Sequence, residues 1–147
     1  MYKIVRKEVL NSTITLLEVE APFVAKKAKP GQFIILRIDE KGERLPLTIG
    51  GFDREKGTVT IIFQLVGLTT KALARLNPGD YLLDFVGPLG MPTETEGIKR
   101  VCVIGGGLGT AIAYPVAKGF HDAGAETDVI VGFRNKDLVI LEDDFRK

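Results

Sequence analysis

Hydrophobic positions follow two different patterns along the chain. From residue 2 to about residue 87, short apolar runs rich in β-branched side chains alternate with polar residues and are separated by turn residues. This pattern is typical of antiparallel strands in a β-barrel or a sandwich. The expected strands span residues 3–9, 13–20, 33–39, 45–50, 58–66 and 81–86.

A short helix is expected among these strands at residues 69–76. Leu73 and Leu76 fall on one helical face, and Asn77-Pro78-Gly79 ends the segment. Residues 88–97 then carry no apolar period and two prolines, as in a connection between domains.

Beyond this connection the pattern becomes that of a parallel sheet. A strand, a helix, a second strand and a second helix are expected at residues 99–104, 113–123, 127–132 and 137–146. This βαβα order indicates a parallel α/β unit. Pro115 fits the first helix if that helix starts near Tyr114, because the first turn has no N–H bonds to lose.

The two patterns predict two domains. We expect an antiparallel β-barrel in residues 1–96, followed in residues 97–147 by the first part of a Rossmann-like parallel domain. Two strands cannot cover both faces of such a sheet, so apolar surface near Val101–Ile104 and Val129–Val131 should need further chain or another subunit to bury it.

Composition narrows the possible functions. The 147 residues are 45% hydrophobic and carry a net charge of +1, with 27% charged residues of both signs interspersed. Neither nucleic acid nor a membrane surface is indicated as a partner. No apolar run approaches the length of a membrane span or a signal peptide, and the one cysteine excludes an internal disulfide, so a cytoplasmic location is expected. Cys102 lies among Val and Ile and should be a small buried side chain, whereas His121 should be solvated.

A glycine loop follows the first strand of the second unit. Gly105, Gly106, Gly107 and Gly109 lead into a helix, the arrangement in which backbone N–H groups approach a pyrophosphate. A strict G-x-G-x-x-G count fails, since Thr110 stands at the third position. No acid ends the next strand, where Arg134 follows instead, so spacing alone leaves NAD and NADP both open.

Two segments of the barrel also carry candidate ligand groups. Arg44 to Ile49 combines an arginine suited to a phosphate with a central hydroxyl at Thr48, and Pro46 places this strand at an edge or a kink. Val66 to Thr70 joins a strand end to a helix start, where N–H groups are free for an anion. Each segment alone is as well explained by an ordinary edge strand or helix cap.

Together these motifs resemble the ferredoxin-NADP reductase superfamily. Arg44-Leu45-Pro46-Leu47-Thr48 resembles its flavin motif, Gly67-Leu68-Thr69-Thr70 its pyrophosphate loop, Gly87-Pro88-Leu89-Gly90 the turn that leaves its barrel, and Gly105–Gly109 its nicotinamide-nucleotide loop. The R-x-P-L-T form, with residues 132–138, is most similar to the small electron-transfer subunits of that superfamily. The resemblance covers essentially the whole chain.

The resemblance implies a Greek-key barrel that binds FAD and a domain that binds NAD(P), with NAD favoured. By position, Arg44 would face the flavin phosphates, Pro46 to Ile49 would line the ring, and Gly67, Thr69 and Thr70 would hold the pyrophosphate. The implied cofactor-binding residues are Arg44, Pro46, Leu47, Thr48, Ile49, Gln64, Val66, Gly67, Thr69, Thr70, Gly105, Gly106, Gly107, Gly109 and Thr110. No side chain is expected to act as an acid or a base, because the flavin carries the reaction.

The chain also departs from that superfamily. Its relatives continue for about another domain and carry a cysteine cluster for a [2Fe-2S] centre, which the single Cys102 cannot provide. The expected function is therefore that of a flavoprotein oxidoreductase subunit or fragment passing electrons between NAD(P)H and an iron-sulfur partner. The alternatives are a docking module without turnover of its own and, less favoured by its composition, an oligonucleotide-type barrel.

Overall fold

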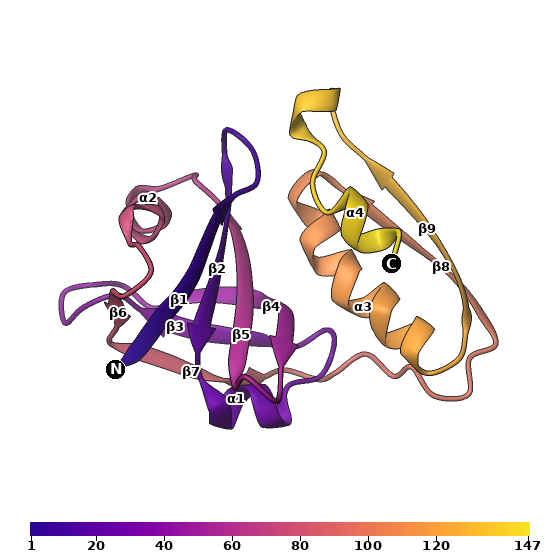
Figure 1. Ribbon diagram of the computed structural model, residues 1–147, viewed down its shortest axis with the longest axis horizontal. Helices are drawn as coiled ribbons and strands as arrows, with labels where there is room; N and C mark the ends of the chain where they lie inside the picture. The colour runs from indigo at the N-terminus through magenta and orange to yellow at the C-terminus, as the bar shows by residue number, and fades with distance from the viewer.

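An antiparallel barrel and a smaller parallel unit lie side by side in the computed structural model, which describes residues 1–147 (Figure 1). The barrel is one sheet in the order β6-β1-β2-β5-β4-β3-β7. Its strands are β1 (Tyr2–Val9), β2 (Ile14–Glu20), β3 (Phe33–Arg37), β4 (Leu45–Asp53), β5 (Thr58–Gln64), β6 (Tyr81–Leu82) and β7 (Asp84–Leu89).

The barrel is nearly closed by a single stretch of chain. Strand β6 pairs with β1 at one edge, and β7 pairs with β3 at the other. Between them the N–H of Leu83 donates to the carbonyls of Arg37 and Ile38, at 3.0 and 3.1 Å. The predicted strand at 81–86 is thus two short strands, one on each edge.

The barrel encloses the main hydrophobic core. Sixteen buried side chains form one cluster there, and Phe63, Phe85 and Leu17 are among its largest members. Alternation along the strands accounts for it, since every second side chain of a strand points inward. Strand β4 runs three residues past its expected end, with a shift in its pairing to β5 between Ile49 and Gly51.

Two helices cap the barrel. Helix α2 (Leu68–Arg75) agrees with the predicted helix to within one residue, whereas α1 (Pro22–Lys27) was not predicted. Six residues are too few to show a helical period, although Pro22 at the first position and Lys26 and Lys27 at the end are helix signals.

The second unit is a parallel pair of strands with one crossover helix. Strands β8 (Arg100–Gly106) and β9 (Glu126–Gly132) pair along their whole length. A 3-10 turn at Gly107–Gly109 and helix α3 (Thr110–Asp122) connect them, and a 3-10 turn η2 (Lys136–Leu138) and helix α4 (Glu142–Phe145) follow. The predicted β-α-β order is confirmed.

Two details of the second unit were predicted wrongly. The expected helix at 137–146 is interrupted, because Leu141 adopts a left-handed conformation at φ 60° and only Glu142–Phe145 is helical. Helix α3 begins at Thr110 rather than near Tyr114, so Pro115 lies inside it. Pro115 has no N–H to donate to the preceding turn, and in that turn Ala111 packs on the barrel.

An apolar contact holds the two units together. Ile14 and Leu16 of β2 and Ile62 of β5 form a buried cluster with Ala111 of α3 and Ile140. The side-chain amide of Asn11 adds a hydrogen bond of 3.2 Å to the carbonyl of Leu138. At the far end of α3 a Cβ on Gly119 would lie 2.8 Å from Pro30, so close approach requires glycine there.

One face of the β8–β9 sheet is uncovered. Helix α3 lies against the face that carries Val101, Val103 and Val129, while Ile104 and Ile130 on the other face are 72% and 57% exposed. Cys102 is on that open face and is exposed, so the prediction of a buried thiol was wrong. The expected apolar exposure of a two-strand sheet is present. No helix of the chain is long and apolar enough to cross a membrane.

The exposure of Cys102 leads to a first prediction. Because this thiol is on the open face, we expect the folded chain to react with an aromatic disulfide reagent at nearly the rate of the denatured chain, with Cys102→Ser as the blank. If Cys102 instead reacted slowly in the folded chain and became reactive on dilution, the open face would be covered by self-association. The measurement is the absorbance of the released thiolate against time at several protein concentrations.

Candidate functional site: a cavity between barrel and glycine loop

Most of the predicted flavin residues meet around one cavity of about 280 Å³ at the junction of the two units. Its barrel wall contains Pro46, Leu47 and Thr48 of β4 and Gln64 of β5, with Val66 and Thr70 beside α2. The opposite wall is formed by Leu108, Ala111 and Ile112 from the start of α3. Two distant segments of the barrel and the glycine loop therefore converge on one space.

The lining of this cavity suits a flat, largely apolar ligand. Eight of its thirteen lining residues are hydrophobic. Thr48 and Gln64 make no side-chain hydrogen bond within the protein and are only partly buried. Cofactor sites are typically apolar cavities with a small number of polar groups that are free to bind the incoming molecule.

The flavin-motif residues do not all reach the cavity. Ile49 is fully buried and belongs to the barrel core, because alternate residues of β4 point to opposite faces. Arg44 is exposed at the start of β4 and forms no ion pair. Arg44 is not among the residues that line the cavity, but its neighbour Leu45 is.

The segment 66–70 forms a tight loop before α2. The hydroxyl of Thr70 accepts hydrogen bonds from the N–H groups of Val66 and Gly67, each at 3.0 Å, and donates to the carbonyl of Gly67. This hydroxyl is therefore engaged in holding the loop. The first helical bond runs from the N–H of Lys71 to Gly67, so the N–H groups of residues 68–70 have no partner within the helix and can face an anion.

The predicted loops lie near each other. The hydroxyl of Thr69 donates a hydrogen bond to the carboxylate of Glu43, the neighbour of Arg44 in the chain. This contact brings the start of β4 to the first turn of α2. Glu43 was not among the predicted residues, because a single acidic residue in a loop carries no recognisable sequence signal.

The glycine loop of the second unit has the shape that its sequence predicts. A Cβ on Gly105 would lie 3.0 Å from both the Cα of Thr110 and the Cβ of Ala113, so strand and helix touch there. A Cβ on Gly106, Gly107 or Gly109 would meet nothing within 4 Å, which leaves that side of the loop open. Gly107 has a φ of +52°, a conformation that favours glycine.

The hydroxyl of Thr110 lacks a hydrogen-bond partner, which is a separate observation on this loop. Its side chain is completely buried at the first position of α3, and its hydroxyl has no hydrogen-bond partner. Burying a hydroxyl without a partner costs about 1–3 kcal/mol. The residues of this loop thus fit a nucleotide that provides polar atoms at the helix start.

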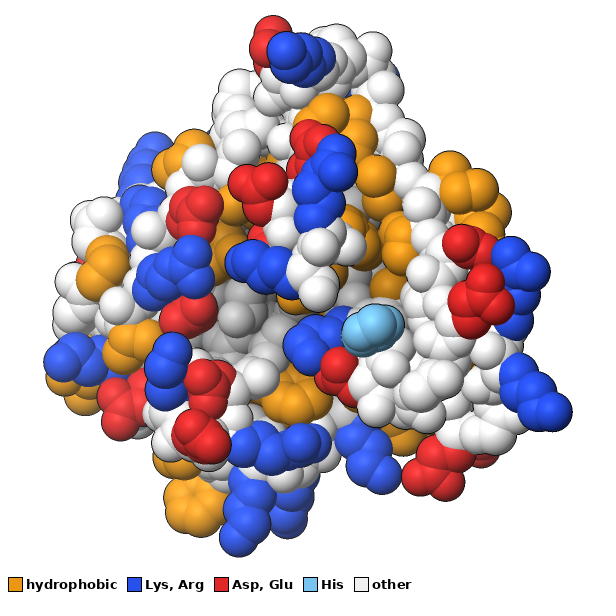
Figure 2. All heavy atoms as spheres, turned by 45° about the vertical axis from the view of Figure 1, so that its right-hand side comes forward, with side chains coloured by type: hydrophobic (Ala, Val, Ile, Leu, Met, Phe, Trp, Pro, Cys, Tyr) orange, Lys and Arg blue, Asp and Glu red, His pale blue; other side chains and the backbone are white.

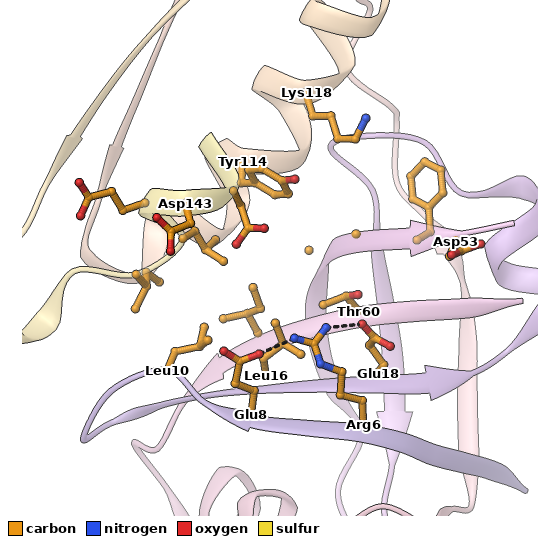
Figure 3. A pocket seen from close by; sticks show the side chains of 18 of the residues that line it. Arg6, Glu8, Leu10, Leu16, Glu18, Asp53, Thr60, Tyr114, Lys118 and Asp143 are labelled. Atoms are coloured by element: carbon orange, nitrogen blue, oxygen red, sulfur yellow. Dashed lines mark hydrogen bonds and ion pairs between the residues drawn. The ribbon is translucent and has the colours of Figure 1, made fainter. Parts of the chain in front are cut away.

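A second, wider hollow separates the two units farther along β4 (Figure 2). Two adjoining parts, of about 670 and 980 Å³, share Phe52 and Asp53 of β4 with Tyr114 and Lys118 of α3. Figure 3 shows α3 on one side of this groove and the strands of the barrel on the other. Burial raises the pKa of Tyr114, and the carboxylate of Asp144 raises it further.

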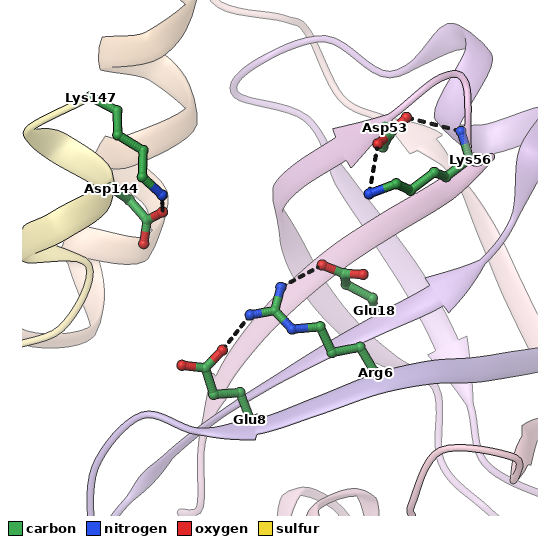
Figure 4. Close-up of polar contacts among 7 residues, drawn as sticks. All are labelled: Arg6, Glu8, Glu18, Asp53, Lys56, Asp144 and Lys147. Carbon is green, nitrogen blue, oxygen red and sulfur yellow. Dashed lines mark hydrogen bonds and ion pairs between the residues drawn. The ribbon is translucent and has the colours of Figure 1, made fainter.

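Several of the charges in this groove are paired with each other (Figure 4). Arg6 is 2.8 Å from Glu18, a hydrogen bond that raises the pKa of Arg6, and it also pairs with Glu8. The N–H of Lys56 donates to Asp53 and lowers the pKa of that carboxyl. Lys118 pairs with Asp122, whereas Lys29, Arg54 and Lys136 of the groove form no ion pair.

The barrel, the cavity and the glycine loop together define a ferredoxin reductase-like fold. Phthalate dioxygenase reductase superposes with a TM-score of 0.82 at 17% identity, over 99% of this chain and 47% of that chain. A solved NADH-dependent reduced ferredoxin-NADP oxidoreductase superposes with a TM-score of 0.93 at 40% identity, over 99% of this chain and 52% of that chain. The predicted fold class is confirmed.

Sequence comparison identifies the group of homologues. The chain is 40% identical to a dihydroorotate dehydrogenase B electron transfer subunit homolog of Thermotoga maritima, over 99% of this chain and 51% of the relative. It is 36% identical to the electron transfer subunit of Fusobacterium nucleatum, over 89% of this chain and 52% of the relative. No family model matches. The chain is a homologue of these subunits, as its motifs predicted, and spans about half their length.

The close approach at Gly105 leads to a matched pair of variants. Gly105→Ala should lower the free energy of unfolding by about 1–3 kcal/mol, because its methyl group would press on Thr110 and Ala113. Gly106→Ala should change it far less, because its Cβ meets only open space. Thermal unfolding followed by circular dichroism measures both, and equal losses would contradict this loop geometry.

Proposed function

We propose that this chain is the FAD-binding part of an electron-transfer flavoprotein that passes electrons between NAD(P)H and an iron-sulfur partner. The observation that carries the proposal is the convergence of Thr48, Gln64 and the loop before α2 on one cavity that α3 closes. The homology to electron transfer subunits supports the same role.

The residues divide the work of holding FAD. Pro46 and Thr48 would face one side of the flavin ring, with Gln64 at its edge, whereas Leu47 shares the core-facing side of β4 with Ile49. Arg44 and the free N–H groups at the start of α2 would hold the phosphates, because a planar guanidinium and a helix N-terminus both favour that anion. When bound, FAD would accept a hydride and release electrons one at a time.

The glycine loop would place NAD(P) beside the same cavity. Residues 105–110 precede α3, and Leu108, Ala111 and Ile112 of the following turn form the cavity wall opposite β4. A nucleotide bound at the start of α3 would therefore bring its nicotinamide toward the flavin side. We favour NAD, as the relatives are named NAD(+) enzymes.

A partner is proposed from the uncovered face of the β8–β9 sheet. Ile104 and Ile130 on that face are an unpartnered apolar surface, and the relatives are about twice as long as this chain. Further chain or a larger iron-sulfur subunit would bury it. This face also favours the second candidate function, a docking module that is inactive toward NAD(P)H by itself.

An absorption spectrum of the chain reconstituted with FAD tests the proposal. A bound flavin band that NADH bleaches supports the electron-transfer function. A band that NADH leaves unchanged supports an FAD-binding part that needs more chain for turnover. No bound flavin overturns the proposed FAD site and leaves the docking function.

Thr48 provides a direct mutational prediction. Thr48→Val keeps the shape of the side chain but removes a free hydroxyl from the cavity, and should weaken FAD binding roughly three- to tenfold, the value of one hydrogen bond. Thr60→Val, on β5 in the groove rather than the cavity, is the control. Titration of flavin fluorescence measures both affinities, and equal affinities would remove Thr48 from the site.

A further inference from the structure

The carboxylate of Glu43 lies at the N-terminal turn of α2. Glu43 belongs to the loop between β3 and β4, which Figure 1 shows close to α2. The hydroxyl of Thr69, the second residue of the helix, donates a hydrogen bond to Glu43. Two segments that are 26 residues apart thus meet at one carboxylate.

This position is one where an anion is favoured. The N–H groups of residues 68–70 have no partner within α2, and the positive end of the helix dipole adds to their attraction for negative charge. No acidic residue occupies the first turn of α2 itself. The carboxylate of Glu43, held by the hydroxyl of Thr69, brings a negative charge next to this turn from another loop, without accepting from its N–H groups.

The phosphates of a bound flavin nucleotide would need the same position. Thr70, next to Thr69, lines the cavity, so a ligand whose ring fills the cavity extends past the first turn of α2. Arg44, beside Glu43, forms no ion pair and would attract the same phosphates. Two anions at one helix end repel each other and cannot share one hydroxyl donor.

We propose that Glu43 is an internal competitor for the flavin phosphates: its carboxylate occupies the anion position of α2 in the flavin-free chain and is displaced when FAD binds. This inference rests on the proposed FAD site. It makes Glu43 a residue that lowers FAD affinity rather than a ligand. On this inference, Glu43 opposes the contribution of the phosphates to FAD affinity. It leaves the contribution of the flavin ring to that affinity unchanged.

The test compares Glu43→Gln with Glu40→Gln. Glutamine at 43 keeps an oxygen that can accept from Thr69 but removes the charge. Glu40 is an exposed acid of the same loop without a contact to α2, so its replacement changes net charge equally and serves as the control. Dissociation constants of FAD and of riboflavin, which has no phosphate, are measured by flavin fluorescence, with circular dichroism confirming the fold.

The expected result is selective for the nucleotide. Glu43→Gln should tighten FAD binding roughly two- to fivefold, the scale of one charge at a helix end, and leave riboflavin binding unchanged. Glu40→Gln should have little effect on either ligand. The inference would also be supported if the Glu43→Gln variant bound FAD and the parent chain did not.

Other outcomes overturn it in distinguishable ways. If the parent chain binds FAD and Glu43→Gln binds it equally or more weakly, Glu43 is not a competitor while the FAD site stands. Equal gains from Glu40→Gln, or an equal gain for riboflavin, would show general electrostatics or a change in the ring site. If neither chain binds FAD, the proposed FAD site and the role of Glu43 both fail.

Discussion

The apolar contact between the barrel and α3 determines the geometry of everything else in this chain. Ile14, Leu16 and Ile62 lie on the outer face of the barrel, and Ala111 of α3 packs on them. Since Ala111 is only one residue after Thr110, the same contact fixes where the glycine loop ends and where the cavity wall begins. The proposed flavin and nicotinamide sites would need such a fixed separation, and the apolar cluster holds the two units without any direct bond between those sites.

Small side chains make this close approach possible. Alanine at 111 and 113 and glycine at 105 and 119 let α3 approach β8 on one side and the barrel on the other. Larger residues there would move the helix axis away, because interiors are packed too closely to absorb extra volume. The start of α3 is therefore a packing surface and also lines the cavity, so its small side chains are required by both contacts.

The sequence predicted most of the architecture because the period of apolar residues is a local property. The approximate strand positions in the barrel and the β-α-β order were correct, whereas the expected strand at 81–86 is split in two and the expected connection at 88–97 begins two residues early, inside β7. The errors have tertiary causes. Helix α3 starts earlier than Pro115 suggested because packing on the barrel outweighs a lost backbone bond. Cys102 is exposed because burial of a strand depends on what covers the sheet, which no single strand records.

The candidate site was predictable only where a motif describes it. Thr48 and Val66 belong to segments that the sequence singled out and line one cavity, as does Gln64, which was expected as a cofactor-binding residue but lies in none of the quoted motifs. Ile112 and Glu43 were not named, because their roles arise from contacts between distant segments. Motifs record which atoms a ligand needs. They do not record which side chain competes for the same place when the ligand is absent.

The two units differ in how far they can support themselves. The cluster of sixteen buried residues lies wholly within the barrel, whereas the buried cluster that includes α3 draws Ile14, Leu16 and Ile62 from the barrel. The parallel unit thus has no hydrophobic cluster made only of its own residues. Its buried apolar residues outside that cluster are few, namely Ala113, Ala117, Phe120 and Ala125, and Ala111 packs against Ile62 of the barrel. The barrel face beneath α3 therefore positions the start of that helix against β4 and β5, where the cavity lies.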